Sequence, residues 1–294
     1  MNIETARELH VNPLEVLELA QQLMTKLGVE ASPQTDPNGY IEQLSKIDPR
    51  SQLQEEAQAN DQDLEEQQKE KMSRQAMQAR VQGGAPIKLA SLVMSTADDL
   101  GLTIEKYPFD DFAQGVDAIL VTSGAASAIK DRTDFAVDEG PDVPIYISGG
   151  PRSSTKYDAP FLISEGQDPE DFNTQADIAT FVAERHDDER VQASISRIEV
   201  ADNYDVIREF ATKHPEIASF ALATTGLYVP SVTAIKGSII SEFRGSIEAR
   251  VYADSSDPAK VAARSPEIYL SEVIKTAVDN VRHKQALIRR RIKK

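Results

Sequence analysis

The chain of 294 residues carries 48 Asp and Glu against 32 Lys and Arg, a formal net charge of −16, and contains no cysteine. The lack of thiols excludes disulfides, thiolate zinc sites, iron–sulfur clusters and cysteine nucleophiles. The acidic balance repels phosphate backbones and anionic membrane surfaces, so we expect neither a nucleic acid nor a membrane as partner. Since no stretch approaches about 20 apolar residues and the start has no signal-peptide pattern, we expect a cytoplasmic protein.

The N-terminal region, residues 1–50, has the pattern of short amphipathic helices. Asn12 is a good N-cap, Pro13 suits the first helical position, and Gly28 suits the end of the helix. The apolar stripe predicted for this helix consists of Leu14, Leu17, Leu19, Leu23 and Leu27. A second short helix is expected over residues 41–47. These helices must pack against something, either the chain's own α/β domain or a partner protein.

Residues 51–84 are predicted to form a polar linker. The segment is dominated by Gln, Glu, Asp, Ala and Arg and offers few apolar side chains to bury. We interpret it as a tether with helical character, and a solvated long helix is the alternative. Gly83 and Gly84 mark its end, and Pro86 opens the next helix.

The rest of the chain, residues 85–294, alternates short apolar runs with helical stretches. The runs cover residues 118–121, 143–147, 218–223 and 247–253. The helical stretches between and after them include residues 174–185, 205–213 and 266–282. This alternation predicts βαβ units. The expected fold is therefore α/β, a Rossmann-like parallel sheet with helices on both faces, preceded by the helical N-terminal segment.

Small polar residues and glycines follow the apolar runs. They are Thr122, Ser123 and Gly124, then Ser148, Gly149 and Gly150, then Thr224 and Thr225, and finally the segment 254–257. In an open parallel sheet all these loops lie at the carboxyl edge, where ligands bind. Glycines let backbone N–H groups approach a ligand and hydroxyls add donors, which suits a phosphate, carboxylate or ribose. The alternative is that these residues only form tight turns and helix caps.

Two arginines close to these loops, Arg132 and Arg152, are candidates for binding an anionic ligand. Surface ion pairs are the alternative. Asp158 and Asp254 can hold a divalent metal in principle, but no ligand spacing supports this, so no metal site is predicted. Dinucleotide, P-loop, nucleophile-elbow and zinc-protease motifs are all missing, and no histidine lies in the loops. The catalytic residues are therefore unknown.

The order of several segments resembles a known family. These segments are residues 117–121, Arg132, residues 148–150, 174–179, Asn203, residues 224–230 and Glu272. They resemble the YdcF-like family, which includes SanA and ElyC, over roughly residues 116–281. The resemblance implies a Rossmann-like domain with a site at the strand ends, and it adds Asn203 and Tyr228 to the candidate ligand-binding residues. Binding of S-adenosylmethionine has been associated with one member, which makes that cofactor an expectation.

Several positions depart from the family pattern, and of the family's Asn-Thr-x-Glu-Asn motif only Asn203 is present. Gln175 stands where the family has Glu, and Tyr228 and Ser231 stand where it has His and Arg.

The first functional hypothesis is a protein that binds a small anionic metabolite, such as a nucleotide, S-adenosylmethionine or a phosphorylated compound, with hydrolase or transferase activity left open. The alternative is a non-enzymatic adaptor that recruits a protein partner through its N-terminal helices.

Overall fold

The computed structural model describes residues 13–49, 89–104, 106–151, 154, 158–198, 203–243, 245–254, 264 and 266–292. The predicted linker, Arg152 and the loop after Asp254 lie outside the described residues. The helices are α1 (Pro13–Lys26), α2 (Pro37–Ile47), α5 (Ala90–Asp99), α6 (Ala126–Glu139), α7 (Ala159–Ser164), α8 (Gln175–Arg185), α9 (Asn203–Lys213), α10 (Val229–Glu242) and α12 (Pro266–Ile292). The strands are β1 (Ala118–Val121), β2 (Ile145–Gly149), β3 (Val191–Ile195), β4 (Ser219–Thr224) and β5 (Glu248–Ala253).

The five strands form one parallel sheet in the order β3-β2-β1-β4-β5. In the centre, Ile119 of β1 pairs with Ile145 of β2 and with Ala221 of β4. All four residues of β1 are buried, as expected for a strand covered on both faces. The predicted fold class, a Rossmann-like α/β fold with a parallel sheet, is confirmed.

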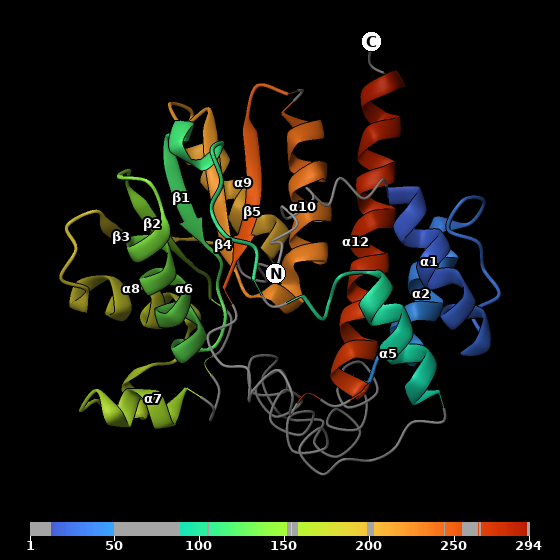
Figure 1. Cartoon of the computed structure of the whole chain (residues 1–294), viewed down its shortest axis with the longest axis horizontal. Helices are drawn as coiled ribbons and strands as arrows, with labels where there is room; N and C mark the ends of the chain where they lie inside the picture. The colour runs from blue at the N-terminus through green and yellow to red at the C-terminus, as the bar shows by residue number, and fades with distance from the viewer. Residues whose placement is uncertain are drawn as a thin grey trace, which may run out of the picture.

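Helices cover both faces of this sheet (Figure 1). On one face, α6 and α8 bury Ile129 and Ile178 against the β1 and β2 side chains. On the other face, α9 and α10 bury Phe210 and Ile235 against Leu120 and its neighbours. Alternate strand residues thus serve two separate apolar layers, because successive side chains in a strand point to opposite faces.

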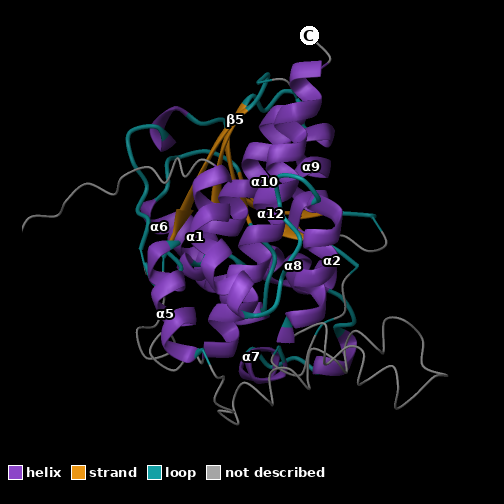
Figure 2. Ribbon diagram, turned by 90° about the vertical axis from the view of Figure 1, so that its right-hand side faces the viewer, coloured by secondary structure: helices purple, strands orange, loops and turns teal. Residues whose placement is uncertain are grey.

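A second helical layer lies beyond α10. The long helix α12 packs against α10 on one side and against α1, α2 and α5 on the other. Figure 2 shows α1 and α12 standing in front of the strands, so this face of the sheet is covered twice. The N-terminal helices therefore dock on α12 and not on the sheet itself. Within the described ranges, no helix is long and apolar enough to cross a membrane.

The buried stripe of α1 differs from the predicted one. Leu14 and Leu19 are exposed, whereas the buried side chains are Val16, Leu17, Ala20, Leu23 and Met24. These five positions follow the 3.6-residue period more closely than the row of leucines does, and they face α12 and α5. The predicted end of the helix is confirmed, because Gly28 follows α1 with a φ of 88°, a conformation that suits glycine.

Candidate functional site

The chain order of the strands creates a topological switch point between β1 and β4. From β1 the chain proceeds through α6 to β2 and then β3, and it returns through α9 to β4 on the other side of β1. The loops after β1 and β4 therefore lead to helices on opposite faces, α6 and α10. In open α/β sheets the ligand binds at the carboxyl edge beside such a point.

Arg132 of α6 connects these two loops. Its Nε donates to Thr225 Oγ1 at 3.0 Å, after β4, and its Nη1 donates to the carbonyls of Thr122 and Ser123 at 2.7 and 2.8 Å, after β1. A third Nη1 contact reaches Thr122 Oγ1 at 3.2 Å. The guanidinium therefore lies at the switch point itself, with four contacts to neutral oxygens.

Arg132 makes no ion pair within the described part of the chain, and the neighbouring carboxylate of Asp131 attracts it only at longer range. Its side chain is only 3% exposed, and no described carboxylate lies within ion-pair distance. Burial lowers the pKa of the guanidinium to about 10, so the group remains cationic at neutral pH. Its hydrogen bonds to described residues use Nε and Nη1, which leaves the two N–H groups of Nη2 for a ligand.

Thr122 and Thr224 join the ends of β1 and β4 directly. The Oγ1 atoms of the two residues lie 3.0 Å apart, and Thr122 Oγ1 also contacts the carbonyl of Ala223 at 3.2 Å. Both side chains are almost fully buried. These hydroxyls therefore hold the strand ends together beneath the loops.

The loop after β1 is held by two further side chains. Ser123 Oγ donates to Asn203 Oδ1 at 3.3 Å, which ties the loop to the start of α9. Gln175 Nε2 donates to the carbonyl of Gly124 at 2.9 Å, from the start of α8. Sequence reasoning noted Gln175 as a departure from a family pattern but did not place it at the site. Since α7 lies between β2 and α8 along the chain, the sequence offers no signal for this contact.

The predicted site residues at the end of β2 make packing contacts in this structure. They are Ser148, Gly149 and Gly150. Ser148 lies inside β2, and its Oγ donates to the carbonyl of Val121 at 2.8 Å. A Cβ on Gly149 would come within 2.8 Å of both Ala179 Cβ and the carbonyl of Gln175. The carbonyl of Gly150 accepts from the α8 backbone at 2.9 Å. Gly149 thus allows the start of α8 to pack closely on the sheet.

Asp158, which directly precedes α7, places its carboxylate at the N-terminus of α6. Its Oδ1 accepts from the N–H of Ala126 at 2.7 Å, and the side chain is 1% exposed. A carboxylate suits the positive end of the helix dipole. The sequence analysis weighed Asp158 as a metal ligand and predicted no metal site. Among the described residues, no group of three or more His, Asp or Glu is placed to hold a metal.

Tyr228 lies beside the same guanidinium. The Cζ of Arg132 is 5.7 Å from the centroid of its ring, and the Nζ of Lys275 on α12 is 5.3 Å from that centroid. The ring is half-buried and contacts the apolar layers on both sides of α10. Sequence reasoning did not identify Lys275, because nothing in a long charged helix singles out one lysine.

The predicted ligand-binding residues thus fall into three groups. The residues gathered around the switch point are Thr122, Ser123, Gly124, Arg132, Asn203, Thr224, Thr225 and Tyr228. Ser148, Gly149 and Gly150 lie on β2 and at its end, where they contact β1 and α8. Arg152 and residues 255–257 lie outside the described residues.

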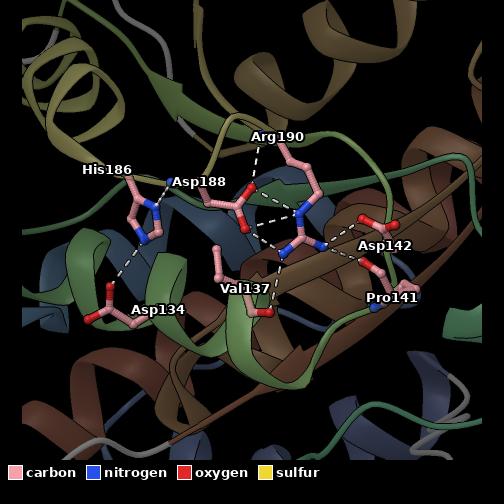
Figure 3. Close-up of polar contacts among 7 residues, drawn as sticks. All are labelled: Asp134, Val137, Pro141, Asp142, His186, Asp188 and Arg190. Atoms are coloured by element: carbon pink, nitrogen blue, oxygen red, sulfur yellow. Dashed lines mark hydrogen bonds and ion pairs between the residues drawn. The ribbon is translucent and has the colours of Figure 1, made fainter.

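A second polar cluster lies at the opposite, amino-terminal edge of the sheet (Figure 3). Arg190 binds both carboxylate oxygens of Asp188 and donates to the carbonyl of Pro141 at 3.2 Å. These hydrogen bonds lower the pKa of Asp188 to about 2. His186 accepts from the N–H of Asp188 and lies 3.5 Å from Asp134 of α6. The cluster joins α6 to the turns before β2 and β3, and its contacts are explained by that structural role.

Comparisons with protein-family models, curated proteins and solved structures give no match to this chain. The resemblance to the YdcF-like family and the S-adenosylmethionine ligand that it implies therefore stay predictions. What can be said of function comes from the geometry of the switch point.

Proposed function

We propose that the chain binds a small anionic metabolite at the β1/β4 switch point, with a phosphate or carboxylate of the ligand on Arg132. The observation that carries this proposal is the nearly complete burial of a guanidinium whose described partners are all neutral oxygens. Anions bind at this position in other open α/β sheets.

The physical support is the cost of burying an unpaired charge. A buried cation is stabilised better by an anion than by neutral acceptors, because the anion adds Coulomb attraction between opposite charges to the hydrogen bonds. In a chain with a net charge of −16, a buried cation at the strand ends whose contacts within the described residues are all with neutral oxygens is unusual. A ligand anion would supply the missing charge.

The surrounding groups are suited to binding. Thr225 Oγ1 accepts from Arg132 and still has its own proton to donate to a ligand. No described histidine or carboxylate contacts Arg132 or Thr225, so a general base next to the ligand has no support within this part of the chain. Binding is therefore the proposed function, and hydrolase or transferase activity is a further proposal that a bound substrate has to establish.

The adaptor hypothesis has less support. Leu17 and Leu23 of α1 are fully buried against α12 and α5, so these two leucines of the predicted stripe are used within the chain. We retain the family resemblance and a cytoplasmic location as proposals. The parallel Rossmann-like sheet agrees with what the resemblance implies.

A thermal-shift panel tests the proposal. Wild-type protein and the Thr225→Val variant are heated with ADP, glucose 6-phosphate, S-adenosylmethionine or pyrophosphate, each compared with a salt blank of equal ionic strength. We expect at least one anion to stabilise the wild type, by about 2.7 kcal/mol at a hundred times its Kd. The stabilisation should be lost or strongly reduced in Thr225→Val and retained in Thr212→Val. No stabilisation of the wild type, or equal stabilisation of Thr225→Val, would contradict the proposal.

A further inference from the structure

Two cations approach the ring of Tyr228 from different helices. Arg132 reaches it from α6, with Cζ 5.7 Å from the centroid, and Lys275 reaches it from α12, with Nζ 5.3 Å away. Attraction to the electron-rich ring stabilises each cation. The two positive charges are thereby held around one side chain at the beginning of α10.

Lys275 resembles Arg132 in having no described counter-ion. Glu272 lies three residues earlier on α12, but no ion pair joins the two, and no other described carboxylate lies within ion-pair distance of Lys275. Other described lysines, such as Lys46, Lys106 and Lys130, do pair with acids. Among the described residues, Arg132 and Lys275 thus share one ring, and no carboxylate lies within ion-pair distance of either.

The position of Lys275 is fixed by its neighbours on α12. Ile274 and Thr276 are fully buried or nearly so, which sets the rotation of the helix. Lys275 itself is half-buried. Its amine therefore lies near the Tyr228 ring because of helix packing, and this placement does not require a partner side chain.

We propose that the ligand of this site carries a phosphate or diphosphate group, shared between Arg132 and Lys275 beside Tyr228. This inference rests on the proposed function. Two positive charges favour a doubly charged group over a single carboxylate, because the Coulomb energy scales with the product of the charges. The planar fork of arginine and the point charge of lysine are both common phosphate ligands. The ligand class is thus a phosphorylated metabolite, and we expect a carboxylate ligand such as S-adenosylmethionine to bind less well.

The proposal also gives α12 a role at the sheet edge. Because α12 carries the layer of α1, α2 and α5, a phosphate that contacts Lys275 links this layer to the loops after β1 and β4. Ligand binding should then protect α12 as well as the loops.

Isothermal titration calorimetry on the full chain tests this inference. The probes are inorganic phosphate, pyrophosphate, ADP and acetate at constant ionic strength. We expect pyrophosphate and ADP to bind, acetate to bind much more weakly, and Lys275→Gln to raise the Kd for pyrophosphate about tenfold, which corresponds to about 1.4 kcal/mol. Lys275→Arg should restore most of the affinity. Lys46→Gln, which removes an exposed lysine of α2, is the matched control and should bind like the wild type.

The outcomes separate the two proposals. If Lys275→Gln binds pyrophosphate like the wild type while Thr225→Val binds it weakly, the anion site stands and the role of Lys275 is wrong. If acetate or S-adenosylmethionine binds more tightly than pyrophosphate and ADP, the phosphate class is wrong. If the wild type binds none of the anions, both proposals fall.

Discussion

The Nε of Arg132 donates to Thr225 Oγ1 at 3.0 Å, so a side chain from α6 on one face of the sheet holds the loop that leads to α10 on the other. The two loops that diverge at the switch point are thereby joined by one guanidinium. This contact gives the site its fixed geometry, and the first prediction follows from removing it.

Thr225→Val should destabilise the protein by about 1–3 kcal/mol, because it leaves a buried charged donor without its acceptor while keeping the side-chain shape. Urea unfolding at neutral pH measures the change. Thr212→Val is the matched control. Thr212 Oγ1 donates to the carbonyl of Arg208 on the exposed side of α9, so its loss should cost within about 0.5 kcal/mol. Equal effects of the two variants would show that the Arg132 contact contributes nothing.

Gly149→Ala should also be destabilising, by about 1–3 kcal/mol, because its Cβ would overlap Ala179 Cβ and the backbone of α8. Gly115→Ala is the control, since a Cβ there meets no atom within 4 Å. Thermal unfolding of the two variants measures the difference. A Gly149→Ala variant as stable as Gly115→Ala would mean that α8 does not pack on β2 in this way.

His283 should make the stability of the α10–α12 contact depend on pH. Burial, with repulsion from Lys236, lowers its pKa from 6.5 to about 4. The unfolded chain therefore takes up a proton at a higher pH than the folded chain does. The contribution of His283 to the free energy of unfolding is therefore fully present above pH 6.5 and is lost as the pH falls from 6.5 to about 4. With allowance for the partial exposure of the ring, the loss is on the order of 2 kcal/mol.

Urea unfolding of the wild type and of His283→Gln at pH 7.5 and pH 4.5 measures this contribution. The variant should lose less stability than the wild type between the two pH values. His214→Gln, which removes a histidine that contacts Glu216 and the ring of Phe210 on α9, should keep the contribution of His283. Identical acid dependence in the wild type and His283→Gln would contradict the assignment.

Much of the sheet could be predicted because its central strands are buried on both faces. Residues 118–121 are continuous apolar residues and form β1 as predicted. Strand β3 was missed, because it is an edge strand in which only Val191 is buried and the following residues alternate with polar ones. Strand β2 begins at Ile145, two residues later than predicted, and it takes in Ser148 and Gly149. Helix α12 was predicted to end at Arg282 and continues to Ile292.

The location of the site could be predicted from the sequence, but its hydrogen bonds could not. Hydroxyls after β1 and β4 do meet, because the carboxyl ends of neighbouring parallel strands share one edge. Arg132 was predicted as a candidate for binding an anionic ligand, but its hydrogen bonds to both loops were not predicted. The sequence contains no signal for that contact, since it depends on how α6 packs on the sheet.

The most direct test of the central claim is the side-chain NMR signal of Arg132 during addition of pyrophosphate. Because the guanidinium is buried and hydrogen-bonded, its Nε–H should exchange slowly and be visible, and its loss in Arg132→Lys identifies the signal. The account predicts a saturable shift of this signal at the concentrations that stabilise the protein, with smaller changes at the distant Arg190. An Arg132 signal that stays unchanged while pyrophosphate binds would place the anion elsewhere and contradict the account.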